Sequence, residues 1–176
     1  MGMMKFLLEL NQEKEYGQIP VIGPEGKVQY TIRGNLDNPN HTLYLNTIEE
    51  EEIGRLYSDG VGVIASFTVD VVNHSLVKVK KVNSPLTNLF YVTRLNYLVT
   101  GSIKKGTYTF RSGIKNVANV KTIMGNSGVV LVCEIKRPED IPFILLISIL
   151  FTQWHVTPLK LPIFPPIGRK YGINLN

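Results

Sequence analysis

The sequence predicts a mainly β protein whose strands wrap around one buried C-terminal helix. The first observation is the run 138–157 (PEDIPFILLISILFTQWHVT), in which only Pro142 and Ser148 interrupt large apolar side chains between Ile141 and Phe151. A surface helix carries polar residues on one side, whereas this segment is apolar all round and is therefore expected to be buried on every side. The second observation is a series of about ten to twelve short strand-like segments separated by turn residues, which is typical of a sandwich or barrel. A buried helix in such a chain needs a sheet around it.

The expected strands follow one another along the chain with glycine, proline and asparagine turns between them. They are residues 4–10, 19–22, 27–33, 41–46, 53–57, 63–72, 75–82, 89–99, 107–111, 115–124 and 129–135. The segment 27–33 (KVQYTIR) alternates apolar and polar residues, so one of its faces is buried and the other is in water. Val117, Val120 and Met124 lie near helical spacing, but 115–124 also alternates as a strand does, and a strand is favoured.

The helix itself is predicted to be a core element. Asp140 is expected to cap it by accepting a backbone N–H, and Pro142 fits its first turn. The apolar run ends at Thr152, well short of the roughly 20 residues that a membrane span needs. The side chains expected to be most buried are Leu145, Leu146, Ile149 and Leu150.

Length and composition indicate one domain over residues 1–158 and a proline-rich tail over 159–176. The 176 residues are 44% hydrophobic, enough for a sizeable core. The single cysteine, Cys133, excludes an internal disulfide framework, and we therefore expect a cytoplasmic location, with peripheral association at a membrane as an option. The net charge of +5 is unevenly spread: residues 1–72 carry 5 Lys/Arg and 11 Asp/Glu, and residues 73–176 carry 14 and 3.

Motifs for catalysis or metal binding are missing from the sequence. The three histidines, His41, His74 and His155, are scattered, and Cys133 lies within a strand, where a thiol is packing. The acidic run 49–52 is expected to be a solvated turn, because adjacent strand residues point to opposite faces and do not converge on a cation. We therefore predict no enzymatic activity, no metal and no cofactor.

The basic second part of the chain suggests an anionic partner. Its lysines and arginines lie on or between neighbouring strands, where they could meet the phosphates of a lipid or of a phosphorylated ligand. The candidate binding residues are Lys78, Lys80, Lys81, Lys104, Lys105, Arg111, Lys115 and Lys121. Nucleic acid is not expected, because the nearby aromatic residues belong to alternating strands and are more typical of a core than of exposed stacking platforms. Solvated strand faces are the simpler alternative for the same lysines.

Several segments resemble the tubby C-terminal-like superfamily, in particular its bacterial members and the plant LURP-one-related proteins. They are the early hairpin 23–32 (GPEGKVQYTI), the strand 96–101 (NYLVTG), the hairpin through 108–110 (YTF), and the strand 129–135 that leads into the apolar helix. The order of elements is similar over nearly the whole chain. The resemblance implies a closed barrel of about twelve antiparallel strands threaded by the hydrophobic C-terminal helix.

The same resemblance implies a binding function. Tubby proteins bind phosphoinositide head groups through basic residues on the barrel, and phospholipid scramblases are thought to be relatives. The lipid-binding residues of tubby do not map onto positions of this sequence, and the proline-rich tail after the helix departs from the pattern. The leading hypothesis is a non-enzymatic protein that binds an anionic membrane surface or a phosphorylated ligand. The alternative is a protein-interaction module that uses the tail or an exposed strand, and the oligomeric state stays open.

Overall fold

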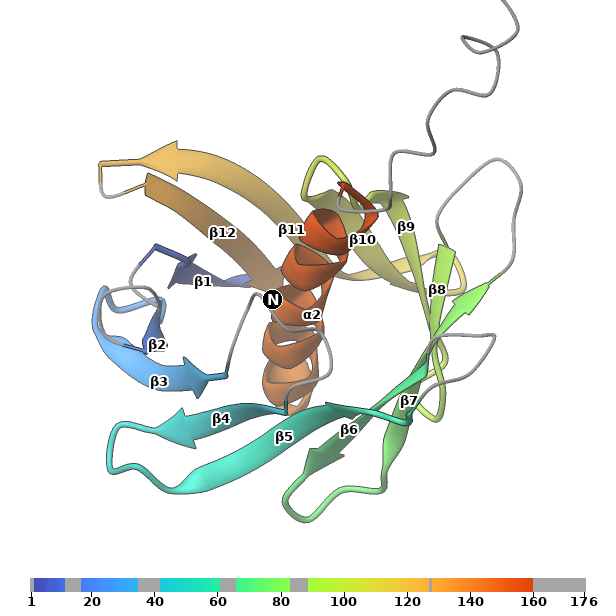
Figure 1. The fold of residues 1–176 in the computed structure, drawn as a ribbon, viewed down its shortest axis with the longest axis horizontal. Coiled ribbons are helices and arrows are strands. Elements are labelled where there is room, and N and C mark those ends of the chain that lie inside the picture. The colour runs from blue at the N-terminus through green and yellow to red at the C-terminus, as the bar shows by residue number, and fades with distance from the viewer. Residues whose placement is uncertain are drawn as a thin grey trace, which may run out of the picture.

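The computed structural model describes residues 2–11, 17–34, 42–60, 66–82, 89–126 and 128–159, with side chains up to Thr152. Twelve strands form one closed antiparallel barrel around the C-terminal helix (Figure 1). The strands are β1 (Met4–Glu9), β2 (Gln18–Ile22), β3 (Val28–Arg33), β4 (Leu43–Thr47), β5 (Glu52–Ser58), β6 (Ser66–Val71), β7 (Val77–Val82), β8 (Leu89–Val92), β9 (Tyr97–Ser102), β10 (Thr107–Ser112), β11 (Lys115–Gly125) and β12 (Gly128–Ile135). The predicted fold class is confirmed.

The barrel is a simple meander that closes on itself. Each strand pairs with its neighbours in sequence, and β1 pairs with β12 from Met4 opposite Ile135 to Glu9 opposite Val130. All strands therefore have two partners, and closure removes the free edges that an open sheet would leave. Side chains along a strand alternate between its two faces: Phe6 and Leu8 of β1 are buried, whereas Lys5, next to Phe6, is exposed, and Leu7 between them is only partly buried.

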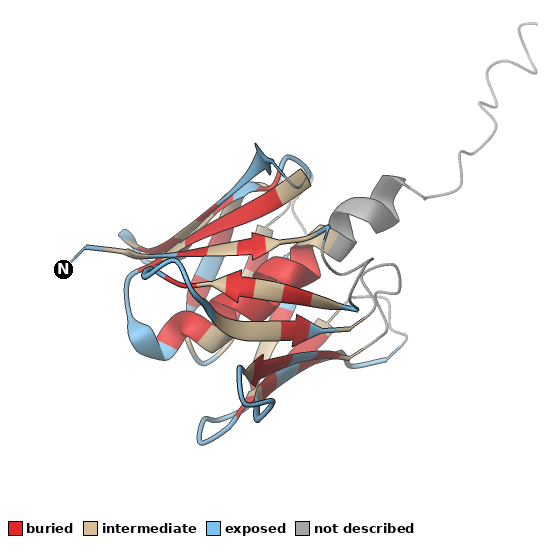
Figure 2. Ribbon diagram, turned by 90° about the vertical axis from the view of Figure 1, so that its left-hand side faces the viewer, coloured by how far each residue is buried: buried red, intermediate tan, exposed pale blue. Residues whose placement is uncertain are grey.

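The interior is filled by the helix. A 3-10 turn, η1 (Pro138–Asp140), precedes α2 (Ile141–Leu159), so the predicted helix 138–157 begins and ends slightly earlier than the α-helix. Leu145, Leu146, Ile149 and Leu150 are all 0% exposed, which confirms that prediction. Figure 2 shows the helix inside the barrel, coloured mostly as buried. Ser148, the one polar residue in the run, donates its hydroxyl to the Ile144 carbonyl at 2.6 Å and needs no other partner.

The helix and the barrel wall lie close together at Gly54. A Cβ on Gly54 of β5 would lie 3.4 Å from Leu146 Cδ1 and 3.3 Å from Val71 Cγ2. The glycine thus leaves just enough room for a leucine side chain against the strand. Farther along the helix, Phe151 packs 4.6 Å from Phe90 and 5.2 Å from Tyr108, between ring centroids.

Two sequence predictions are wrong in detail. The segment 89–99 was expected to be one strand, but it is β8 and β9 joined by a tight turn in which Arg94 and Asn96 have φ of 63° and 55°. These left-handed conformations reverse the chain within four residues. Asp140 was expected to cap the helix through a backbone N–H, but its carboxylate accepts hydrogen bonds from the side chains of Tyr97 and Arg137.

The strand predicted over 115–124 is confirmed as β11. The expected tail 159–176 lies almost wholly outside the described residues.

Candidate functional site

The register of β11 and β12 brings basic residues together where the helix begins. Ala118 lies opposite Ile135, so residues before Ala118 run beside residues after Ile135. The backbone N–H of Lys136 donates to the Val117 carbonyl at 3.0 Å and extends the pairing by one residue. Lys115 and Lys136 are thereby placed at the same end of the barrel, which we call the helix-start end.

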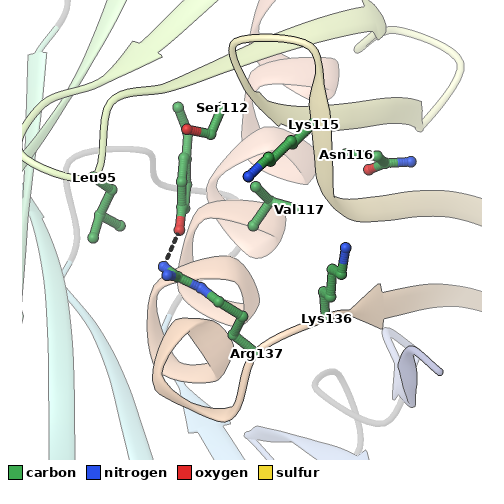
Figure 3. Close-up of a pocket in the computed structure, with 8 residues that line it drawn as sticks. Leu95, Ser112, Lys115, Asn116, Val117, Lys136 and Arg137 are labelled. Carbon is green, nitrogen blue, oxygen red and sulfur yellow. Dashed lines mark hydrogen bonds between the residues drawn. The ribbon is translucent and has the colours of Figure 1, made fainter. Parts of the chain in front are cut away.

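A pocket of about 370 Å³ opens between these segments, and we call it the basic pocket. Its cationic residues are Lys115, Lys136 and Arg137, contributed by the start of β11 and by the segment between β12 and η1. Figure 3 shows Lys115 and Lys136 reaching toward the space from different sides, with Arg137 below Lys115 and to the left of Lys136. Its other lining residues are Leu95, Tyr97, Ser112, Asn116 and Val117.

Arg137 is held in place by a carboxylate and a phenol. Its Nε lies 2.9 Å from Asp140 Oδ2, and its Nη2 donates to the Tyr97 hydroxyl at 2.5 Å. The Tyr97 hydroxyl in turn donates to Asp140 Oδ1 at 2.9 Å, and Glu139 adds a longer contact of 3.5 Å to Arg137. Asp140 is only 1% exposed, so this network ties the start of the helix to β9. The charge of Arg137 is largely offset by its two carboxylate neighbours.

The pKa values of the network follow from burial and charge. Burial raises the pKa of Tyr97 to about 12, and its hydrogen bond to the Asp140 carboxylate acts in the same direction. Hydrogen bonding to Asp140 raises the pKa of Arg137 above its usual range. Arg137 and Tyr97 therefore keep their protons at neutral pH, and the network serves as a rigid wall of the pocket rather than as an acid–base pair.

The two lysines are the free cations of the basic pocket. Both side chains are exposed, and neither Lys115 nor Lys136 has an ion pair among the described residues. On the same wall, Asn116 Nδ2 donates to Asn119 Oδ1 at 2.8 Å, whereas the buried Asn116 Oδ1 has no hydrogen-bond partner in the part of the chain that the structure describes. Two uncompensated ammonium groups beside a polar wall are suited to an anion with several acceptor oxygens.

The other residues predicted for binding are spread over the barrel. Of these residues, Arg111 lies nearest to the basic pocket, because it is on β10 opposite Asn116, which lines the pocket. Lys121 is exposed on β11, farther from the helix-start end. Lys104 and Lys105 occupy the β9–β10 turn at the opposite end, about 20 Å away along a six-residue strand.

The three lysines of β7 do not share one environment. Lys78 Nζ lies 2.9 Å from Asp59 Oδ1, and this carboxylate also accepts hydrogen bonds from Ser66 and Thr68. Burial acts against ionisation of Asp59, but these hydrogen bonds together lower its pKa, so Lys78 faces a stable anion. Lys80 is exposed, whereas Lys81 is half-buried beside the inward-facing Phe90. The structure thus joins only Lys115 of the predicted set to the pocket, with Arg111 next to it.

Sequence reasoning missed Lys136 and Arg137. Both follow β12 directly, and the only local signal is a basic pair beside the Pro-Glu-Asp segment that starts the helix. Their role depends on the pairing of β12 with β11, which the local sequence does not encode.

Other chemically interesting residues are structural. Cys133 is 0% exposed, burial raises its pKa to about 12, and its Sγ lies 3.7 Å from Ser148 Oγ. Residues 49–51 of the acidic run form an exposed turn after β4, with Glu50 at φ 65°, as the sequence predicts, whereas Glu52 is already the first residue of β5. His74 packs edge-on against Phe143. Within the described ranges, no cluster of three histidine, cysteine or acidic residues is arranged to hold a metal ion.

A second hollow lies on the outer face of β3–β5, with a volume of about 410 Å³. Arg33 and Tyr44 line it together with Asn46, Glu50 and Glu52. Glu52 is bound to Arg55 at 2.6 Å, and one arginine against two glutamates leaves no excess of positive charge. This hollow is therefore a poorer site for the predicted anion than the basic pocket.

Comparison with known proteins gives one informative likeness. The chain matches no known protein family, and no curated protein sequence is significantly similar to it. Its fold is similar to the X-ray structure of the protein AT5G01750 from Arabidopsis thaliana, with a TM-score of 0.53 and 14% identity over 85% of this chain and 90% of the plant chain. The likeness is one of fold.

The apolar character of the helix that fills the barrel raises the question of a membrane span, for which the sequence predicts too short a run. None of the helices in the described part of the chain combines the length and the apolar character that crossing a bilayer requires.

Proposed function

We propose that this protein is a non-enzymatic binding protein that holds a phosphorylated group in the basic pocket. The observation that carries the proposal is a pair of exposed lysines, Lys115 and Lys136, that have no ion pair within the described segments. They lie on a pocket whose third cation is already fixed. A phosphate group offers several strong acceptor oxygens and a charge that two ammonium groups offset. A volume of about 370 Å³ fits a head group or a small phosphate ester.

We further propose that the chain is a tubby-like protein. The segments 23–32 and 96–101 and the final strand and helix support this, together with a closed twelve-stranded barrel and the fold likeness to the plant protein. The expected cytoplasmic location and peripheral association with anionic lipid belong to the same proposal. The pocket residues come from this chain's own geometry and not from positions known in tubby.

Two sources of the phosphate are consistent with this site: a phospholipid head group and a free phosphorylated molecule. Binding would be tested with inorganic phosphate, followed through amide NMR shifts, and with vesicles containing about 30% phosphatidylserine, followed by co-sedimentation. The Lys115→Ala/Lys136→Ala double variant is expected to weaken vesicle binding by about 30-fold, because each lysine near an anionic surface contributes about 1 kcal/mol.

The matched control removes the same charge from the opposite end of the barrel. Lys104→Ala/Lys105→Ala changes the net charge equally but leaves the basic pocket intact, so it is expected to retain most of the binding. Equal losses in both double variants would mean that only overall charge matters, and the proposed site would be wrong. Binding of inorganic phosphate at the pocket without vesicle binding would identify a free ligand.

The alternative function, a protein-interaction module, has weaker support. Each described strand is already paired on both sides, so none of the described strands offers a free edge to which a partner's strand could add. The use of the proline-rich tail remains a prediction, to be tested by deleting residues 159–176 and comparing oligomeric state and bound partners.

A further inference from the structure

One large apolar side chain stands almost fully in water beside the basic pocket. Ile114 is 96% exposed, more than any other exposed large hydrophobic residue of the described chain, and the next is Met124 at 77%. It occupies the β10–β11 turn after Gly113, whose φ of 59° lets the chain reverse there. Single exposed apolar residues are common on proteins, so exposure alone would assign it no role.

Its surroundings make Ile114 unusual. Ser112 and Lys115 flank the turn, and both line the basic pocket, so Ile114 stands on the pocket rim. The described segments 93–97, 111–117 and 136–140, which form this side of the helix-start end, hold five basic and two acidic residues. The basic ones are Arg94, Arg111, Lys115, Lys136 and Arg137. One of the two acids, Asp140, is buried against Arg137.

The other side of the same end has the opposite charge. The β4–β5 turn and the first residue of β5 carry the acidic run 49–52 next to Ile48, which is 61% exposed. An anionic surface would therefore be attracted to the side of β9–β12 and repelled from the side of β4–β5. The barrel offers two exposed isoleucines at one end, one in a basic and one in an acidic setting.

From this arrangement we infer that Ile114 inserts into an anionic lipid bilayer while the basic pocket holds a lipid head group. The inference rests on the proposed function and selects the bilayer as the source of the phosphate. A protein interface needs a contiguous apolar core, whereas the chain neighbours of Ile114 are Gly113 and Lys115, with Ser112 and Asn116 beyond them. A bilayer interface accepts one apolar side chain below a ring of lysines and arginines, because the charges stay at the head groups.

Insertion can be observed directly with a single fluorescent label. Cys133 is the only cysteine, is 0% exposed and has a pKa raised to about 12, so an introduced surface cysteine is the sole reactive thiol. Ile114→Cys carrying an environment-sensitive dye is expected to shift to shorter wavelength with vesicles containing about 30% phosphatidylserine. Ile48→Cys, labelled in the same way, is expected to show no shift.

Affinity provides the second measurement. Ile114→Ser is expected to weaken the affinity for these vesicles, measured by co-sedimentation, about tenfold. The reason is that serine lacks most of the apolar surface whose transfer from water to the bilayer favours binding. Ile48→Ser is expected to bind as the unchanged protein does. Both substitutions lie at exposed turns, so folding should be preserved, and circular dichroism would check this.

The outcomes separate this inference from the proposed function. If Lys115→Ala/Lys136→Ala weakens binding but neither Ile114 experiment shows an effect, the pocket stands and the insertion is wrong. If labels at positions 114 and 48 respond alike, the predicted orientation is wrong and the inference falls. If neither the lysine pair nor Ile114 affects vesicle binding or phosphate binding, both proposals fall.

Discussion

Leu146 tests whether the helix is the structural centre of the barrel. It is 0% exposed, and its Cδ1 lies at contact distance from the position that a Cβ of Gly54 would take. β5 is hydrogen-bonded to β4 and β6, so the wall cannot move inward to fill a gap. Leu146→Ala should therefore leave most of the cavity open and lower the free energy of unfolding by about 4 kcal/mol.

Leu146→Asp should be worse than the alanine variant. It would leave a carboxylate inside an apolar core without a partner, at a cost comparable to the whole stability of a domain, about 5–15 kcal/mol. Urea unfolding followed by circular dichroism would measure Leu146→Ala, and Leu98→Ala is the control because Leu98 is 38% exposed on β9. A loss below about 1 kcal/mol for Leu146→Ala, or a cooperatively folded Leu146→Asp, would show that the helix does not stabilise the barrel.

Three further predictions concern other parts of the structure. Tyr97→Phe should cost about 1–2 kcal/mol at neutral pH. Folding raises the pKa of Tyr97 from 10.0 to about 12, so the contribution of the protonated phenol to stability is complete below pH 10 and is lost between pH 10 and 12. The free energy of unfolding of the variant should therefore fall less over that interval than that of the unchanged protein. Gly101→Ala should cost about 2 kcal/mol or more, because φ is +127° and the new Cβ would lie 2.8 Å from Tyr108 Cα; thermal unfolding would check it. Lys78→Ala should cost less than about 1 kcal/mol in urea unfolding. The lowered pKa of Asp59 means that this small loss should disappear as the pH falls below 3.8.

The fold could be predicted because its two determinants are local patterns. The helix is apolar on all sides, which excludes a surface position, and strands such as 27–33 alternate with period two. The split between β8 and β9 was missed because the turn residues Arg94 and Asn96 lie between two apolar stretches in a segment without glycine or proline. Left-handed conformations at such residues depend on the strands that they connect.

The basic pocket was only partly predictable. Lys115 belongs to the predicted basic set, but its pocket neighbours Lys136 and Arg137 come from beyond β12 and meet it through the register of Ala118 with Ile135. The same holds for Asp140, whose partner Tyr97 is 43 residues away in sequence. Charge counts showed that the second part of the chain is basic, but they could not separate Lys78, which has a carboxylate partner, from lysines that have none.

The proposal that a phosphorylated group binds at the helix-start end is tested most directly by mapping amide NMR shifts during a titration with inorganic phosphate. The expected result is a set of saturable shifts in residues 112–117 and 136–137, which disappears in Lys115→Ala/Lys136→Ala. Residues 103–106, at the opposite end, serve as the internal reference and should not move. Shifts that are strongest at 103–106 or along β7, or that continue without saturation over the whole surface, would contradict the proposed site.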